Sequence, residues 1–200
     1  MLKKLISILL CAVLVLSCFA MYSCGKDEGG DDSSSGGTGD ESQSEGKTAK
    51  NPSCADIMTA VVAAYPDIPK QKTLYLAGAT EDSEAFIDPE FACYLYTANY
   101  EEFPEFASFA DYAIRLPDGK SAFEIHIVKA ASAGDVETVK SVLNQRIDRL
   151  NEGDIKLYDA ENFEKVIKNA SVTSDGEYVF LLITTDNAPA NTAIQGAMYE

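Results

Sequence analysis

The chain is poor in the side chains that most often build metal sites and nucleophilic centres. It has no tryptophan, a single histidine (His126) and five cysteines in 200 residues. Only Cys54 and Cys93 lie beyond residue 24, with no C-x-x-C or zinc spacing. They are compatible with one disulfide or with two buried thiols. These absences exclude most metal centres and histidine-dependent triads, so we expect no catalytic residue, no metal and no cofactor.

Basic residues are also scarce. The chain has 16 Lys and Arg against 32 Asp and Glu, a net charge of −16. Nucleic acids and anionic lipids are bound by clustered Lys and Arg, so the composition excludes a nucleic-acid partner. An acidic surface favours a cationic protein or peptide. Aromatic side chains beside the acids leave a glycan as a further candidate.

The N-terminus has the composition of an export signal. A basic start at Lys3 and Lys4 is followed by an apolar run over residues 5–20 and by Cys24, which opens onto polar residues. We predict a lipoprotein signal peptide over residues 1–23, lipid on Cys24, and export to the outer face of the cytoplasmic membrane. Two acyl chains on one residue make a stable anchor.

Two alternatives to this anchor stay open. Cys18 follows Val15-Leu16-Ser17, which fits the lipobox pattern more closely than the residues before Cys24 do, but it is followed by more apolar residues. A plain secretory signal without lipid is the other alternative.

Residues 24–50 are predicted to be a tether. After Cys24 this stretch consists of small, polar and charged residues and has no large apolar side chain, so it cannot bury enough surface to offset the entropy of ordering. Glycine and serine make it flexible, and its carboxylates extend it. Residues 51–200 remain, which is the length of one domain with a substantial core.

The pattern of residues 51–200 predicts a single α+β domain. Apolar residues spaced three and four apart predict helices over 56–65, 89–98, 135–151, 160–169 and 188–198. Alternating or continuous apolar runs predict strands over 73–77, 112–116, 123–127, 171–174 and 177–185. We expect a mostly antiparallel sheet of four to five strands, with the helices packed mainly on one face.

The turn Pro117–Lys120 joins two of these predicted strands. A four-residue loop places Ile114 opposite Phe123 and gathers the apolar side chains on one face of the hairpin. The opposite, solvated face then carries Arg115, Glu124 and His126. We interpret His126 as a sheet residue rather than a catalytic base, because the sequence shows no partner constellation for it.

The segment 81–109 interleaves acidic and aromatic residues, and no Lys or Arg occurs between Lys72 and Arg115. One interpretation is a groove that captures a cationic peptide or stacks on a sugar. The other is that the aromatic residues form core and the acids are its solvated edge, which is the commoner role of aromatic residues. The candidate binding residues of this segment are Tyr94, Tyr96, Tyr100, Glu101 and Glu102.

The second half of the chain resembles a known family. A strand over residues 123–129 precedes a helix that carries Arg146; Tyr158 follows, and then the run Gly176-Glu177-Tyr178-Val179-Phe180. This order resembles a family of Gram-positive lipoproteins described as domain of unknown function 4358 (DUF4358). The resemblance implies secretion, lipid anchoring and an α+β domain, but no activity. It also adds Arg146 and Tyr158 to the candidate residues, more as a structural pair than as a site.

We therefore expect a lipid-anchored, extracytoplasmic binding or interaction module of the cell envelope, and not an enzyme. One alternative is a hydrolase with paired carboxylates among Glu101, Glu102 and Glu105, which requires two carboxyl groups roughly 5–9.5 Å apart. Another alternative is a structural subunit of an envelope assembly, whose partner covers the sheet face of Arg115, Glu124 and His126.

Overall fold

The computed structural model describes residues 48–65, 72–97, 103–117, 121–153 and 160–200. Several sequence predictions lie outside these residues: the signal peptide, nearly all of the tether, and the candidates Cys24, Tyr100, Glu101, Glu102 and Tyr158. Within the described part of the chain, no helix is both long enough and apolar enough to cross a membrane.

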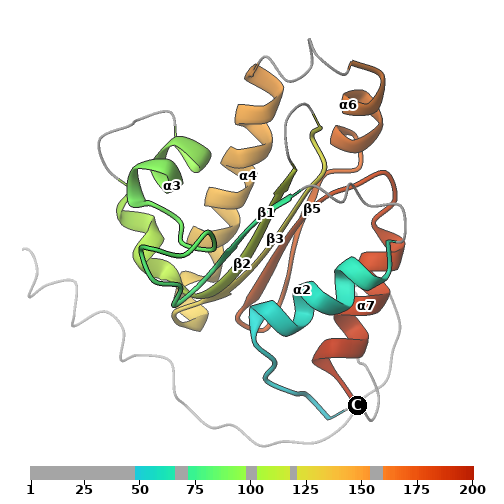
Figure 1. The fold of residues 1–200 in the computed structure, drawn as a ribbon. Helices are drawn as coiled ribbons and strands as arrows, with labels where there is room; N and C mark the ends of the chain where they lie inside the picture. Colours follow the sequence, from blue (N-terminus) through green and yellow to red (C-terminus); the bar gives the residue numbers. More distant parts are fainter. Residues whose placement is uncertain (1–47, 66–71, 98–102, 118–120, 154–159) are drawn as a thin grey trace, which may run out of the picture. The chain divides into compact units, whose positions relative to one another are not determined.

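One antiparallel sheet of five strands forms the centre of the domain, in the order β1-β2-β3-β5-β4 (Figure 1). The strands are β1 (Lys72–Leu76), β2 (Phe109–Pro117), β3 (Glu124–Ala130), β4 (Ser171–Asp175) and β5 (Tyr178–Ile183). Gly176, at a φ of 56°, makes the predicted turn between β4 and β5. All six residues of β5 are buried, as expected of an interior strand. The predicted α+β class and sheet size are confirmed.

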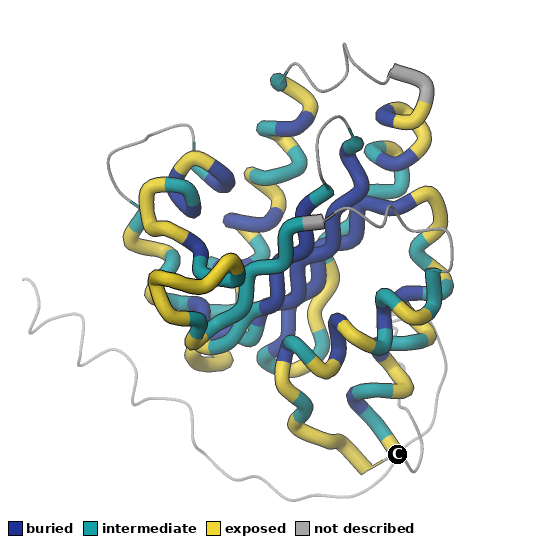
Figure 2. The backbone as a smooth tube through the Cα atoms, in the orientation of Figure 1, coloured by how far each residue is buried: buried dark blue, intermediate teal, exposed yellow. Residues whose placement is uncertain are grey.

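Helices cover both faces of the sheet (Figures 1 and 2). One face packs against α2 (Cys54–Ala63) and α7 (Ala188–Met198). The other face packs against α3 (Pro89–Tyr96), the short 3-10 helix η2 (Pro104–Ser108), α4 (Val136–Glu152) and α6 (Ala160–Ile167). A further 3-10 turn, η3 (Ala133–Asp135), leads into α4.

The expectation that helices pack mainly on one face therefore needs correction. Strand β3 is buried on both of its faces: Ile125 and Ile127 belong to the core under α2 and α7, whereas Val128 and Ala130 belong to the core under α3 and α4. A sheet that is apolar on both faces needs a helical layer on each of them.

The register of the hairpin β2–β3 differs from the predicted one by three residues. Ile114 lies opposite His126, and Arg115 lies opposite Ile125. A shift by an odd number of residues sends alternate side chains to the other face, so Ile114 and Ile125 lie in different cores. The prediction assumed one solvated face, whereas both are covered and the apolar pattern fits either register.

The first described residues are paired with the C-terminus. Ala49 forms an antiparallel bridge with Tyr199, and the Lys50 backbone N–H donates to the Met198 carbonyl at 2.7 Å. A Lys50–Glu200 ion pair at 3.6 Å lies beside them. The chain thus enters the domain next to the end of α7.

Candidate functional site

Four polar side chains meet inside the core between the sheet, α3 and α4. Glu124 and His126 come from β3, where residues two apart share a face; Arg146 comes from α4 and Tyr96 from the end of α3. Glu124 is 1% exposed, His126 and Tyr96 are fully buried, and the side chain of Arg146 is 12% exposed. We call these four residues the buried tetrad.

Glu124 and Arg146 form a two-pronged ion pair at one end of the tetrad. Arg146 donates through Nε to Glu124 Oε2 at 2.9 Å and through Nη2 to Oε1 at 2.5 Å. The fork of a guanidinium matches the two oxygens of a carboxylate, which makes such pairs strong and well oriented. Arg146 Nη1 also donates to the Leu95 carbonyl at 3.3 Å. The guanidinium therefore links α4 to both β3 and the end of α3.

The hydrogen bonds of the tetrad fix the proton positions of His126. An ionised carboxylate only accepts, so His126 Nε2 carries the proton that is donated to Glu124 Oε2 at 3.2 Å. Nδ1 is then an acceptor, and the Tyr96 hydroxyl donates to it at 2.9 Å. The two rings meet edge to face, with centroids 5.6 Å apart. One continuous chain of donors and acceptors thus runs from Tyr96 to Arg146.

Burial and charge set the ionisation of each member. Burial by itself raises the pKa of Glu124, but the charge and hydrogen bonds of Arg146, assisted by His126, outweigh it and bring the pKa to about 2. Burial lowers the pKa of His126 and raises that of Tyr96 well above its usual value. At neutral pH, Glu124 and Arg146 are charged, and His126 and Tyr96 are neutral.

The tetrad has the polarity of a proton relay, but its position suits a structural role. Tyr96 is enclosed by the rings of Phe103 and Phe109, at centroid distances of 5.5 and 5.9 Å. A reacting group has to reach its substrate at hydrogen-bonding distance, and the fully buried Tyr96 and His126 have no surface to offer. What the arrangement does chemically is hold α3, β3 and α4 together through directional bonds.

A second feature lies on the outside of the same layer. We call it the acidic lobe, and it comprises residues 78–97 and 103–108: the loop after β1, α3 and η2 (green in Figure 1). Its described carboxylates are all exposed, namely Glu81, Asp82, Glu84, Asp88, Glu90 and Glu105. Most of its aromatic rings face inward, because Phe91, Phe103 and Phe106 pack against the core.

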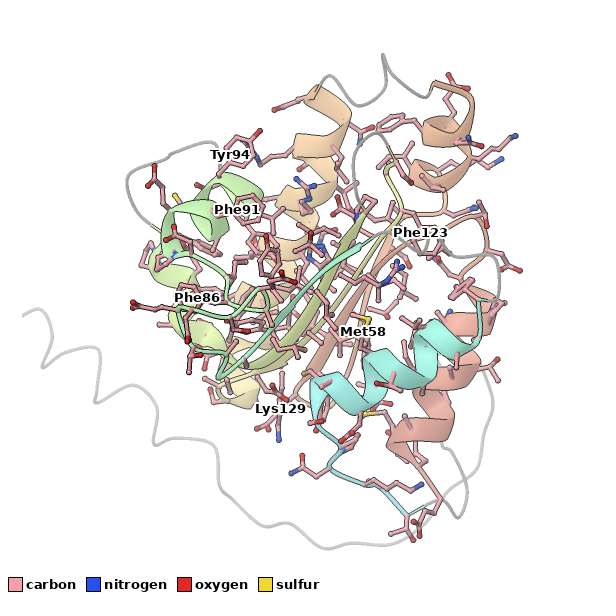
Figure 3. The ribbon with its side chains drawn as sticks, viewed as in Figure 1. Met58, Phe86, Phe91, Tyr94, Phe123 and Lys129 are labelled. Atoms are coloured by element: carbon pink, nitrogen blue, oxygen red, sulfur yellow. The ribbon has the colours of Figure 1, made fainter. Side chains whose placement is uncertain are left out.

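Tyr94 is the exception among the aromatic residues of the lobe (Figure 3). It is 52% exposed, whereas Tyr96, two residues further along α3, is fully buried. The Arg149 guanidinium lies 5.6 Å from the centroid of the Tyr94 ring, and the Phe91 ring lies 6.2 Å away. Tyr94 is therefore the one large apolar side chain exposed in the described part of the chain.

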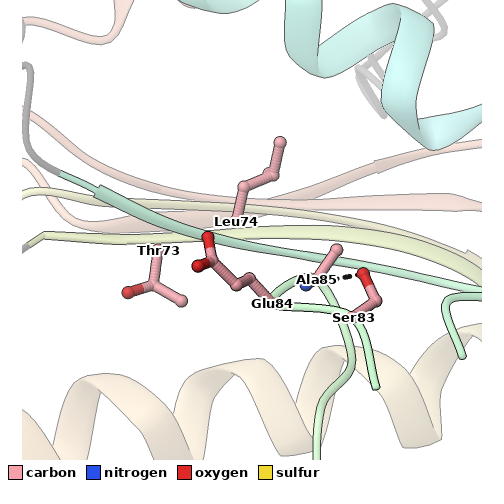
Figure 4. Close-up of a pocket in the computed structure, with 5 residues that line it drawn as sticks. All are labelled: Thr73, Leu74, Ser83, Glu84 and Ala85. Carbon is pink, nitrogen blue, oxygen red and sulfur yellow. Dashed lines mark hydrogen bonds between the residues drawn. The ribbon is translucent and has the colours of Figure 1, made fainter. Parts of the chain in front are cut away.

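A surface hollow of about 620 Å³ lies where the lobe meets the edge strand β1 (Figure 4). Its lining residues are Thr73, Leu74, Ser83, Glu84 and Ala85. Ser83 Oγ accepts the Ala85 backbone N–H at 3.1 Å, which shapes the loop at this point. The hollow is open and offers one carboxylate and two hydroxyls, so it adds polar surface to the lobe rather than a closed ligand pocket.

The structure brings together two of the predicted site residues, Tyr96 and Arg146, but inside the core. Their partners Glu124 and His126 were expected on a solvated face and were not among the candidates; both are buried because α3 and α4 cover that face. A signal was present: a carboxylate and an imidazole alternate on a strand with apolar flanks, and an arginine borders the apolar seam of a neighbouring helix.

Arg115 was grouped with Glu124 and His126 but lies on the opposite face of the sheet. It is 1% exposed, and its guanidinium carbon lies 6.0 Å from the centroid of Phe123. The face that a partner subunit was expected to cover is thus covered by the chain's own helices. Glu105, the described member of the hydrolase candidates, is exposed on η2.

The two cysteines of the domain are free thiols. Cys54 and Cys93 form no disulfide; each is a buried thiol. They lie in α2 and α3, which pack against opposite faces of the sheet. Burial, with a contribution from Asp111, raises the pKa of the Cys54 thiol. Among the described residues, no group of His, Cys, Asp and Glu could hold a metal ion.

Part of the chain matches a known family model. Residues 107–184 match the family model described as "Domain of unknown function (DUF4358)". The predicted resemblance to DUF4358 is confirmed over these residues. The DUF4358 match contains Glu124, His126 and Arg146 of the tetrad, whereas Tyr96 and most of the acidic lobe precede it. No curated protein and no solved structure gives a match.

Proposed function

We propose that the protein is a lipid-anchored, extracytoplasmic binding module of the cell envelope, whose acidic lobe docks a cationic protein or peptide. The observation that carries this proposal is the run of exposed carboxylates from Glu81 to Glu105, in a stretch where no Lys or Arg occurs between Lys72 and Arg115. Exposed carboxylates on neighbouring elements attract a cationic partner over several ångströms and speed its association.

The exposed chemistry favours a cation over a glycan. Sugar recognition relies on exposed aromatic faces, and Tyr94 is the one ring with large exposure in the described part of the chain. The lobe offers six exposed carboxylates instead. Attraction of this kind weakens with salt, because the screening length falls to about 3 Å at 1 M ionic strength.

The N-terminal residues support the proposed location. An apolar run, a cysteine and a polar tether are typical of an exported lipoprotein, and the part of the tether after Cys24, residues 25–50, gives a flexible reach of roughly 25–30 Å. Labelling with an alkyne fatty acid and membrane fractionation test this point. Cys24→Ser should abolish labelling and release the protein, and Cys18→Ser should not. Labelling that survives Cys24→Ser and is lost in Cys18→Ser would move the anchor to Cys18.

Docking can be tested with a defined cationic probe. A fluorescent decalysine peptide is titrated against the full chain in detergent, at low and at high salt. The lobe variant carries Glu81→Gln, Glu84→Gln and Glu90→Gln. A control variant with the same charge change elsewhere on the surface carries Asp148→Asn, Glu152→Gln and Glu164→Gln.

We expect the lobe variant to bind the probe about tenfold more weakly than the wild type, since about 1.4 kcal/mol of lost attraction is a factor of ten. The control should change much less, and high salt should weaken the wild type most. Equal losses in the two variants would show attraction to net charge alone and would contradict a docking surface on the lobe. Absence of binding at low salt would do the same.

A further inference from the structure

The acidic lobe is tied to the rest of the domain through the end of α3. The last two residues of this helix are both bonded to other members of the buried tetrad. The Leu95 carbonyl accepts from Arg146, and the hydroxyl of Tyr96, itself a tetrad member, donates to His126. The helix has eight residues, which is too short to be stable without tertiary contacts. Its position, and that of the carboxylates around it, therefore depends on these bonds and on the aromatic packing beside them.

The bond between Tyr96 and His126 exists in only one protonation state of the imidazole. It requires a lone pair on Nδ1, to which the phenol donates. A second proton on the ring would occupy Nδ1, so that two donors would face each other across 2.9 Å. The phenol would then have to turn its hydrogen away inside a core that leaves Tyr96 fully buried.

The groups around His126 determine how stable its protonated form is inside the core. Its own strand offers Glu124, whose two oxygens already accept from Arg146 of α4. The neighbouring strands place Ile114 and Leu181 directly opposite. The other titratable groups on this side of the sheet include the phenol of Tyr96 and the buried thiol of Cys93 on α3, and the partly buried phenols of Tyr112 on β2 and Tyr75 on β1. None of these phenols is an anion at neutral pH, because burial raises the pKa of each. A protonated imidazole would thus be a buried cation near a guanidinium.

We propose that the buried tetrad is an acid-sensitive latch: with His126 neutral it holds α3 and the acidic lobe against the sheet, and with His126 protonated it releases α3. The consequence for docking rests on the function proposed above; the latch itself does not. Burial lowers the pKa of His126 from its ordinary 6.5, so the released form takes up the proton more readily. The hold on α3 is therefore complete above about pH 6.5 and weakens as the pH falls below it.

Hydrogen exchange on the full chain in detergent tests the latch without any ligand. Amide exchange is measured at about pH 7 and about pH 5, which bracket histidine titration, and is corrected for the intrinsic pH dependence. We expect exchange over residues 89–96 to rise about tenfold in acid, since about 1.4 kcal/mol of lost stabilisation is a factor of ten, while α7 on the other face stays protected. In His126→Gln, whose amide can still donate to Glu124 but does not titrate, α3 should exchange equally at both pH values.

Three results would overturn the latch. They are α3 exchange that does not depend on pH in the wild type, the same rise in His126→Gln, and an equal rise in α7, which would mean global unfolding. Tyr96→Phe gives a second reading should the glutamine variant fail to fold: it keeps the ring and removes the donor. Its α3 should already exchange at about pH 7 as fast as the wild type does in acid, and wild-type protection there would refute the latch.

The two proposals can fail separately. If decalysine does not bind the lobe at any pH while α3 still loosens in acid, the latch stands and the docking function falls. If decalysine binds equally at both pH values while α3 stays protected in acid, docking stands and the latch falls. If both hold, acid should weaken decalysine binding in the wild type and not in His126→Gln.

Discussion

Both faces of the sheet are covered by helices, but different kinds of side chain are buried on the two faces. Under α2 and α7, strand β3 contributes Ile125 and Ile127, which pack mainly with aliphatic and aromatic neighbours; the guanidinium of Arg115 on β2 is also buried on this face. Under α3 and α4, the same strand contributes Glu124 and His126, which are just as buried. Apolar burial contributes about 25 cal/mol per Å² and has no preferred direction. The hydrogen bonds of the tetrad fix the orientation of α3 and α4 on the sheet, and they make the stability of this face depend on pH.

This difference predicts how each face fails. A buried ion pair adds little net stability when intact, because desolvation offsets the attraction, but removing one partner leaves an uncompensated charge in the core. An apolar core loses stability in proportion to the volume removed. Substitutions in the buried tetrad should therefore have larger effects that depend on pH, and substitutions of the aliphatic residues under α2 and α7 should have smaller effects that do not.

The largest effect should come from Glu124→Gln. This change keeps the shape of the side chain but leaves the Arg146 guanidinium buried without its carboxylate. We expect a loss of about 3–5 kcal/mol in the free energy of unfolding, measured by urea denaturation of the full chain near neutral pH. A loss below about 1 kcal/mol would mean that the pair is solvated in solution.

The next effect is the acid sensitivity of the wild type. The pKa of Glu124 falls from 4.5 to about 2 on folding, so its stabilisation is fully present above pH 4.5 and is lost as the pH falls toward 2. The shift corresponds to about 3 kcal/mol. Urea midpoints measured from about pH 6 downward should fall in this window. Glu124→Gln should show a shallower slope there, and an unchanged slope would assign the acid sensitivity to other carboxylates.

A smaller effect is expected for Tyr96→Phe. The change keeps the ring but leaves His126 Nδ1 without a donor, which should cost about 1–2 kcal/mol in unfolding free energy. Tyr75→Phe is the matched control, because Tyr75 lies half-buried on the edge strand β1 of the same face; it should change stability by less than about 0.5 kcal/mol. Equal effects of the two changes would argue against a structural role for the Tyr96 hydroxyl.

The elements of the fold could be predicted from the sequence to a large extent, because they depend on local patterns. The Asp175-Gly176 turn is specified by the left-handed conformation of glycine, and the burial of β5 follows from its continuous apolar run. The register of β2 against β3 could not be predicted, because both faces of these strands are covered. Alternation selects a register only when one face is solvated.

The tetrad could be predicted only in part, for a related reason. Its members lie on α3, β3 and α4, so their contact depends on how these elements pack, and composition says nothing about that. Arg146 was a candidate only through the family resemblance, and its partner Glu124 lies 22 residues away in the chain. Glu124 and His126 looked solvated because charged and polar residues are seldom fully buried. Glu124 and His126 depart from this tendency because each of them is hydrogen-bonded to a partner inside the core.

The smallest predicted effect sharpens the comparison from the apolar side. Ile127→Val removes one methylene next to His126 in the chain, but from the core under α2 and α7. It should cost about 1 kcal/mol, with the same cost at pH 7 and pH 5 in urea denaturation, because the residues packed around it in that core are mainly aliphatic and aromatic. His126→Gln on the other face should instead differ from the wild type by an amount that changes with pH. If the stability change of Ile127→Val varied with pH in the same way as that of His126→Gln, the two faces of the sheet would be coupled. The effect of the tetrad would then not be confined to the core under α3 and α4.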